Sequence, residues 1–149
     1  MGITNQAFVA EGVKEFEGRI KKYVSYERIE LPVVKISPET SPFELKKKEA
    51  IILLKQISDG DYLVLLDENG KIYNSVEFAS QLQKMMNRGV KNICFMIGGA
   101  YGFDQSVYDR ADSKIALSAM TFSHQLVRVI FAEQLYRGLS ILKGEKYHH

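Results

Sequence analysis

Two stretches in the last third of the chain combine residue types that suit the binding of a small ligand. The first is a glycine-rich stretch over 97–103, and the second is a mixed polar and apolar stretch over 117–128. Gly98, Gly99 and Gly102 have no Cβ, so the backbone there can take positive φ and approach a ligand closely. The second stretch mixes apolar and hydrogen-bonding side chains, among them Ser118, Met120, Thr121, Phe122, Ser123, His124 and Leu126. This mixture is typical of a pocket rim.

His124 and Arg128 are the side chains of the second stretch that suit proton transfer or anion binding. They are four residues apart, so on a helix they would project from one face and could meet one substrate. His124 is either a helix-start residue satisfied by local hydrogen bonds or a functional group on the pocket rim, and its neighbours favour the second. Glu133 and Arg137 have the same spacing, which predicts an intrahelical ion pair.

Residue spacing argues against several common kinds of site. The glycine stretch does not follow the G-x-G-x-x-G pattern of dinucleotide-binding turns, and no G-K-[ST] follows it as in a P-loop. His124 has no Cys or carboxylate at ligand spacing, so no metal site is expected. A nucleophile elbow is not expected either, because the chain has no G-x-S-x-G. Cys94 lies within an apolar run and is interpreted as a core residue.

The charge of the chain does not by itself indicate RNA binding, because the formal net charge is only +2. The triplet Lys46–Lys48 is interpreted as a solvated helix face. Near the C-terminus, basic residues are interleaved with tyrosines, a pattern that could contact phosphates and stack on bases. This group contains Arg128, Tyr136, Arg137, Lys143, Lys146 and Tyr147. On charge alone, RNA binding is the less favoured interpretation.

The elements that must position these residues alternate between helices and strands. Apolar residues at helical spacing predict helices over 6–23, 43–57, 75–88, 104–110 and 123–142. Apolar and β-branched runs predict strands over 26–36, 62–66, 92–97 and 114–118. We expect a turn at Asp67–Gly70, an N-cap at Ser75 and a C-cap at Gly89.

This alternation predicts an α/β fold with a parallel sheet flanked by helices. Ligands of such folds bind beyond the carboxyl ends of the strands. Leu66, Gly98 and Leu117 lie at three of these ends. The two ligand-binding stretches are therefore expected to meet at one edge of the sheet.

Length and composition predict one globular domain over 1–149. A chain of 149 residues can bury about 70% of the surface that its unfolded form exposes. No apolar run approaches the roughly 18 residues of a membrane span, and no signal peptide is recognised, so we expect a cytoplasmic protein. The last predicted helix is apolar on more than one side, which favours a dimer seam.

Taken together, the chain resembles the SPOUT superfamily of methyltransferases, and more closely its ribosomal RNA large-subunit methyltransferase H branch. The matching segments are Leu65–Asp67 with Gly70-Lys71, Phe95–Gly102, Leu117–Arg128, Glu133–Arg137 and Tyr147–His149. The similarity covers nearly the whole chain.

The resemblance implies a sheet whose C-terminal part is threaded as a deep trefoil knot. It implies that S-adenosylmethionine binds in a bent shape in the knot, against Leu66, Gly98, Gly99, Leu117, Ser118, Ala119, Met120, Thr121 and Phe122. It also implies a homodimer with the pocket near the subunit seam. The methyl acceptor would be ring nitrogen 3 of a pseudouridine in 23S ribosomal RNA, within the assembled ribosome.

Within this resemblance we assign hypothetical roles to the polar residues. A sulfonium methyl group is already activated, so the protein must mainly align donor and acceptor and make the ring nitrogen nucleophilic. We expect His124 or a terminal histidine to assist loss of the imide proton, and Arg128 to stabilise the developing anion or a phosphate. Arg137, Tyr147 and His148 would help dock the RNA.

The start of the chain departs from the family pattern. Members usually begin with an apolar strand ahead of a G-K-T-like turn, whereas this chain begins Met1-Gly2-Ile3-Thr4. The N-terminal strand is therefore expected to be missing, which would leave a gap or a new edge in the sheet. Two other functions remain open: a non-catalytic ribosome- or RNA-binding module of the same fold, and a flavodoxin-like nucleotide-binding regulatory domain.

Overall fold

The computed structural model describes residues 2, 4–35 and 37–148, and the side chain of His148 lies outside this description. The helices are α1 (Ala7–Ile20), α2 (Pro42–Leu54), α3 (Ser75–Met86), α4 (Gln105–Arg110) and α5 (Leu126–Leu142). The strands are β1 (Tyr62–Ile72), β2 (Ile93–Ile97) and β3 (Ser113–Ala116), and a 3-10 helix, η1 (Lys146–His148), follows α5.

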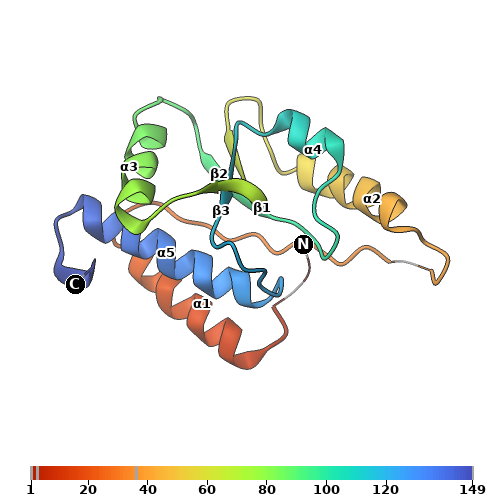
Figure 1. The fold of residues 1–149 in the computed structure, drawn as a ribbon, viewed down its shortest axis with the longest axis horizontal. Helices are drawn as coiled ribbons and strands as arrows, with labels where there is room; N and C mark the ends of the chain where they lie inside the picture. Colours follow the sequence, from red (N-terminus) through yellow and green to blue (C-terminus); the bar gives the residue numbers. More distant parts are fainter. Residues whose placement is uncertain (1, 3, 36, 149) are drawn as a thin grey trace.

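Three parallel strands form the sheet, in the order β2-β1-β3. Helices α1, α3 and α5 lie on one side of the sheet and α2 and α4 on the other, with α1 and α5 side by side (Figure 1). Because both faces of β1 are covered, its apolar run Tyr62–Leu65 is buried throughout. The predicted α/β fold with a parallel sheet flanked by helices is confirmed.

Two apolar clusters fill the spaces between the layers. The cluster under α1, α3 and α5 is the larger one, and its buried members include Ile20, Val64, Phe78, Leu82, Ile115, Phe131 and Leu135. The cluster under α2 and α4 includes Leu53, Leu63, Leu65, Met96, Phe103 and Val107. Side chains of β1 therefore alternate between the two clusters, and β1 is anchored from both sides.

Strand β1 pairs with β3 in two short stretches that are out of register with each other. Leu66 and Lys71 both lie opposite Ile115, so residues 67–70 interrupt the pairing with β3. The turn expected there is an interruption within β1 rather than the end of the strand. A Cβ at Gly70 would lie only 2.5 Å from the carbonyl carbon of Ile115. Because glycine has no Cβ, the two backbones can approach each other more closely here than any other residue would allow.

The strand predicted over 26–36 is wrong for the described residues, because 25–35 have no regular secondary structure and Ile36 lies outside the described part. Leu31 packs against the cluster under α2, and its carbonyl accepts a hydrogen bond of 3.1 Å from the N–H of Gly2. Ile29 and Val33 are 56% and 68% exposed. A β-branched run forms a strand only when a neighbouring strand pairs with it.

Several boundaries also differ from the expected ones. Helix α3 is capped by Asn74, not Ser75, through a capping box in which Asn74 and Glu77 exchange hydrogen bonds of 2.9 Å. Strand β3 ends at Ala116, so Leu117 and Ser118 belong to the loop that follows. Helix α5 begins at Leu126 rather than near Ser123. These shifts lengthen the irregular stretch that can contact a ligand.

Candidate functional site

A cleft of about 690 Å³ opens at the carboxyl ends of the three strands. Its walls come from the interruption in β1, the loop after β2, the loop after β3, and single residues of α2, α4 and α5. The lining residues are Lys46, Leu66, Asp67, Glu68, Asn69, Ile97, Gly98, Gly99, Ala100, Tyr101, Gly102, Phe103, Tyr108, Ile115, Leu117, Ser118, Met120, Thr121, Phe122, Ser123, His124 and Val127. The cleft therefore joins the two stretches that the sequence singled out.

Most of the residues predicted to bind the cofactor meet in this cleft. Eight of them line it: Leu66, Gly98, Gly99, Leu117, Ser118, Met120, Thr121 and Phe122. Ala119 lies in the same loop but is not among the lining residues. The hydroxyl oxygen of Ser118 accepts a hydrogen bond of 2.9 Å from the N–H of Met120, which shapes the loop.

Neighbouring side chains fill the space that a side chain at Gly98 or Gly99, the glycines after β2, would need. A Cβ at Gly98 would lie 3.2 Å from the ring of Phe103, and a Cβ at Gly99 would lie 2.6 Å from both carboxylate oxygens of Glu49. Glu49 is buried on α2, and this burial raises the pKa of its carboxyl above the ordinary value. Backbone peptide groups, not side chains, therefore form this wall of the cleft.

Asp67 and Tyr108 form a polar pair in the cleft that sequence reasoning did not identify. The Tyr108 hydroxyl donates a hydrogen bond of 2.5 Å to Oδ2 of Asp67, and Oδ1 accepts one of 2.8 Å from the N–H of Asn69. Burial, with the contact to Asp67, raises the pKa of Tyr108 to about 12. The sequence did carry a signal for Asp67: it directly follows the buried apolar run of β1, at the end of a strand where ligands of such folds bind.

The charged side chains of the cleft favour a cationic ligand. Among the described lining residues, the carboxylates of Asp67 and Glu68 outnumber the single ammonium of Lys46. Lys46 is half-buried, whereas Lys47 and Lys48 are exposed. The interpretation of the triplet as a solvated face therefore fits Lys47 and Lys48, while Lys46 belongs to the cleft wall.

His124 lies on the rim of the cleft, in the turn that precedes α5, and its side chain is exposed. The hydroxyl oxygen of the neighbouring Ser123 accepts a hydrogen bond of 3.2 Å from the N–H of Leu126, the first residue of α5. An imidazole at this point can reach a ligand in the cleft and exchange a proton with it.

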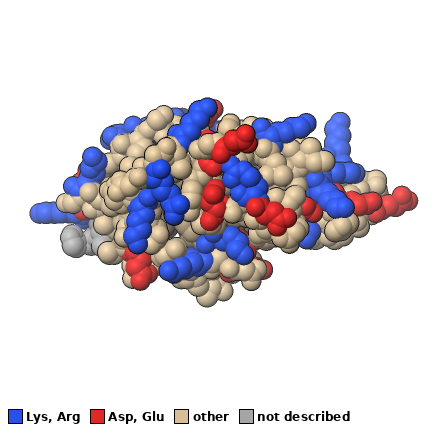
Figure 2. Space-filling view, turned by 90° about the horizontal axis from the view of Figure 1, so that it is seen from above, with Lys and Arg blue, Asp and Glu red and all other residues tan. Residues whose placement is uncertain are grey.

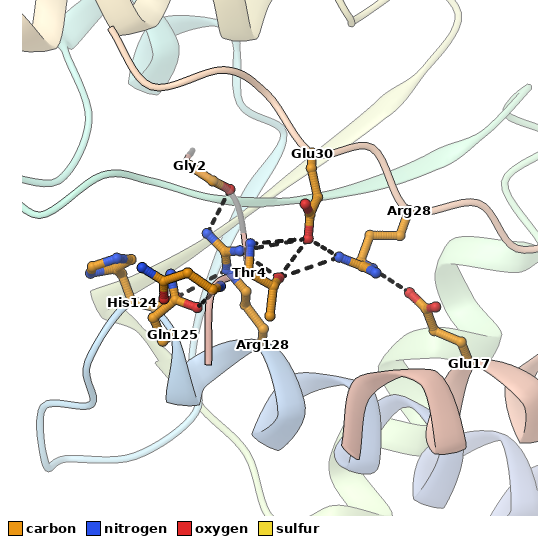
Figure 3. A network of polar contacts seen from close by, with 9 residues as sticks. Gly2, Thr4, Glu17, Arg28, Glu30, His124, Gln125 and Arg128 are labelled. Carbon is orange, nitrogen blue, oxygen red and sulfur yellow. Dashed lines mark hydrogen bonds and ion pairs between the residues drawn. The ribbon is translucent and has the colours of Figure 1, made fainter. Parts of the chain in front are cut away.

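Arg128 does not line the cleft, although it is four residues from His124. Its side chain is only 8% exposed and its guanidinium is turned toward the N-terminal segment (Figure 3). It donates hydrogen bonds of 2.8 Å to the carbonyl of Gly2, 2.7 Å to the hydroxyl of Thr4 and 3.2 Å to the carbonyl of His124. Burial lowers its pKa below the ordinary value, although the nearby Glu30 carboxylate opposes this shift. The structure therefore does not bring His124 and Arg128 together in the cleft.

Comparison with known proteins identifies the family. A family model described as "Predicted SPOUT methyltransferase" matches residues 1–148. Curated proteins named ribosomal RNA large subunit methyltransferase H are 47% identical in Cytophaga hutchinsonii, 43% in Parabacteroides distasonis and 45% in Christiangramia forsetii. Each alignment covers all of this chain and 95–96% of the relative. The chain belongs to the SPOUT methyltransferase family.

In this SPOUT chain, two of the residues predicted to dock RNA, Arg137 and Tyr147, lie together at the end of α5. Arg137 and Glu133 form an ion pair of 2.5 Å, as expected, and the Arg137 guanidinium lies 4.8 Å from the ring centroid of Tyr147. Tyr147 also packs edge-on against Tyr136, with ring centroids 4.6 Å apart. Arg137 and Tyr147 do not line the cleft. The side chain of His148 lies outside the described part.

The described part of the SPOUT chain lacks two kinds of feature, a membrane-spanning helix and a metal-binding cluster. In residues 2, 4–35 and 37–148, no helix is both long and apolar enough to cross a bilayer. The same part of the chain contains no group of three or more His, Cys, Asp or Glu side chains that could hold a metal ion.

Proposed function

We propose that this protein transfers the methyl group of S-adenosylmethionine to ring nitrogen 3 of a pseudouridine in 23S ribosomal RNA of the large subunit, in the cytoplasm. One observation carries the proposal: segments far apart in the sequence that match the family form a single cleft at the carboxyl ends of the strands. The family membership and the names of the relatives support the reaction class.

The residues of the cleft fit S-adenosylmethionine. The adenosine part needs apolar cover and exposed backbone groups for its hydrogen-bonding edges, which Leu66, Leu117 and the glycine stretch supply. The cofactor carries one net positive charge, and the excess of carboxylates in the cleft complements it. When bound, it supplies a methyl group activated on a sulfonium.

His124 is the proposed general base. The imide nitrogen of pseudouridine carries a proton, and removing it makes the nitrogen nucleophilic. His124 lies on the rim of the cleft, where an acceptor base entering from solvent would meet it. Backbone N–H groups of the loops after β2 and β3 would hold the reacting groups in line, which is the larger part of the catalysis here.

The proposed RNA interface extends from the cleft to the surface. Figure 2 shows basic and acidic side chains mixed across the face seen from above, so this face has no broad basic field. Local cations must therefore contact the phosphates. We assign phosphate contacts to Lys46 in the cleft wall and to Arg137 at the end of α5. Tyr147 and His148 would help dock the RNA beside Arg137.

The proposal also includes the knot and the subunit arrangement. Membership of the SPOUT family supports threading of the C-terminal part as a deep trefoil knot. The half-buried outer surface of α5, next to an exposed Phe8 on α1, supports a homodimer seam on that side.

Calorimetric titration with S-adenosylmethionine tests the cofactor, and transfer of labelled methyl to ribosomes that lack the modification tests the substrate. We expect stoichiometric binding, and incorporation at one pseudouridine of the large subunit. Ribosome binding without cofactor binding would instead support the non-catalytic module. Equal transfer to protein-free RNA would overturn the choice of the assembled ribosome as substrate.

A further inference from the structure

Arg128 joins segments that are far apart in the sequence. Its guanidinium lies between the N-terminal segment and the start of α5, and three of its nitrogens donate hydrogen bonds to Gly2, Thr4 and His124 at 2.7–3.2 Å. Glu30, on the extended segment after α1, lies 3.8 Å from it. A planar guanidinium suits this task, because it presents several donors in a fixed geometry.

The network continues away from Arg128 and fixes its partners in turn (Figure 3). The Thr4 hydroxyl donates a hydrogen bond of 2.5 Å to Glu30, and Glu30 also pairs with Arg28. Arg28 forms a second ion pair of 2.5 Å with Glu17 on α1. The partners of Arg128 are thus tied to α1 and to the extended segment.

The Arg128 network contacts the turn at His124 and Gln125, beside the cleft. The Nε of Arg128 donates to the backbone carbonyl of His124, while the imidazole of His124 points away from the guanidinium (Figure 3). The adjacent Gln125 is buried, and its side-chain oxygen accepts a hydrogen bond of 3.4 Å from the N–H of Asn5. Both contacts hold the turn from the side of the N-terminal segment.

We propose that Arg128 is a positioning residue: it fixes the backbone of His124 so that the imidazole faces the acceptor nitrogen. This inference rests on the proposed function, in which His124 is the general base. It replaces the role predicted for Arg128 from the sequence, because a guanidinium that contacts a substrate anion would have to leave its buried partners. A misplacement of about 1 Å is enough to cost on the order of a hundredfold in rate.

A double-mutant cycle tests whether Arg128 acts through His124. Single-turnover rates of methyl transfer, at saturating cofactor, are measured for the wild type, Arg128→Ala, His124→Ala and the double variant. We expect Arg128→Ala to lower the rate roughly tenfold to hundredfold in the wild-type background and less than about threefold in the His124→Ala background. An equal effect in both backgrounds would overturn the inference, because Arg128 would then act independently of His124.

Arg110→Ala is the matched control for loss of stability. Arg110 also donates hydrogen bonds to backbone carbonyls, those of Ser58 and Asp61 at 3.0 Å, and it does not line the cleft. We expect Arg110→Ala to lower the melting temperature without changing the single-turnover rate. A comparable rate loss in Arg110→Ala would mean that the Arg128 effect is general destabilisation, and the inference would fail.

A measurement independent of turnover keeps the inference testable if the variants are too slow. The chain has three histidines, so the imidazole signals of His124 can be assigned by NMR with His124→Ala. We expect S-adenosylmethionine to shift the His124 signal in the wild type, and the shift to be lost in Arg128→Ala. Thr4→Val, which removes one partner of Arg128 but keeps the guanidinium, should give an intermediate response. An unchanged His124 shift in both variants would refute the positioning role.

Failure of the proposed function would give a different result. If the wild type bound no S-adenosylmethionine, or if His124→Ala kept the full rate, the cofactor or the general base would be wrong. The inference fails instead when the wild type binds cofactor and needs His124, while loss of Arg128 leaves the His124 signal and rate unchanged. Arg128→Lys adds a further test, because one ammonium cannot replace the guanidinium fork and should rescue only part of the rate.

Discussion

Asp67 contributes a negative charge to the cleft. Its carboxylate is held in place by hydrogen bonds from the Tyr108 hydroxyl and the N–H of Asn69. Because these two hydrogen bonds leave the carboxylate little freedom, its charge has a defined position relative to a bound ligand. With its pKa raised to about 12, Tyr108 stays protonated and remains a donor to Asp67 throughout the physiological range. A cationic ligand gains from this arrangement, and a neutral one does not.

The substitution Asp67→Asn separates these two kinds of ligand. We expect it to weaken S-adenosylmethionine binding about tenfold, or roughly 1.4 kcal/mol, through lost charge attraction in a partly screened cleft. Binding of S-adenosylhomocysteine, which lacks the sulfonium charge, should change less. Calorimetric titration of both ligands measures the difference. Asp109→Asn is the control, because Asp109 is exposed on α4 and lies outside the cleft. If Asp67→Asn weakened the binding of both ligands equally, the charge argument would be wrong.

The substitution His124→Ala tests the general base. We expect the rate of methyl transfer to fall about 10²- to 10⁴-fold, because proton removal by a positioned side chain typically contributes that much. Cofactor affinity should stay within about threefold of wild type, since the binding loop 117–122 is unchanged. Single-turnover transfer and calorimetry measure the two quantities. A large loss of affinity with an unchanged rate at saturation would assign His124 to binding instead.

At the scale of elements, Gly70 brings β1 so close to β3 that a side chain at this position would meet the backbone of β3. Gly70→Ala would bring a methyl group to 2.5–2.7 Å from backbone atoms of Ile115 and Ala116. Backbone cannot yield as a flexible side chain does, so we expect a loss of about 2–3 kcal/mol in the free energy of unfolding, measured with urea. Gly18→Ala is the matched control.

Gly18 lies within α1, and a Cβ there would meet no atom within 4 Å. We therefore expect Gly18→Ala to stabilise the protein by about 0.5–1 kcal/mol, since alanine favours the helix. If Gly70→Ala were as harmless as Gly18→Ala, the two strands would not pass as closely as described.

A second element-scale prediction concerns the turn before β1. The N–H of Ser58 and the side-chain amide of Asn92 donate hydrogen bonds of 2.8 and 2.6 Å to Asp61, and these lower the pKa of its carboxyl. Because the folded pKa lies below the unfolded one, Asp61 stabilises the protein at neutral pH. This contribution is lost as the pH falls below about 4.

Asp61→Asn should therefore cost about 1–2 kcal/mol of unfolding free energy at pH 7, and the difference from wild type should shrink as the pH falls below about 4. Urea denaturation at a series of pH values measures this difference. Asp59→Asn, in the exposed part of the same turn, should show little difference at any pH. A gap for Asp61→Asn that stayed constant down to pH 3 would contradict the assignment.

The sequence predicted the elements whose patterns are local, and missed features that depend on distant partners. The run at Tyr62–Leu66 and the loop at Gly98 were recognisable because apolar runs and glycines carry their own signal. The segment 26–36 reads as a strand, but strand formation needs a neighbour that the pattern cannot reveal. The same limit applies to Arg128: its spacing from His124 was visible, but its contacts with Gly2 and Thr4 were not.

For the whole molecule, the proposed subunit seam raises the question of what a single chain can do. The residues of one chain line the cleft, and we predict that they are sufficient to bind the cofactor. The RNA-docking residues assigned at the end of α5 lie outside this cleft. In a homodimer, the partner's copy of that cluster can lie next to the cleft, which would make methyl transfer, but not cofactor binding, depend on the dimer.

Phe8 offers a direct test of this division. It lies on α1, the helix that runs beside α5 (Figure 1). Its side chain is 63% exposed in the single chain. If the seam covers it, Phe8→Asp would bury a carboxylate among apolar groups, which costs several kcal/mol and should give monomers of 17.0 kDa at micromolar concentration. Ile51→Asp, at 59% exposure on α2 across the sheet, should remain a dimer. Sedimentation velocity measures the mass of each variant.

We expect monomeric Phe8→Asp to bind S-adenosylmethionine with an affinity within about threefold of wild type, but to lose methyl transfer to ribosomes. A monomer that methylates ribosomes normally would mean that the partner contributes nothing to RNA docking.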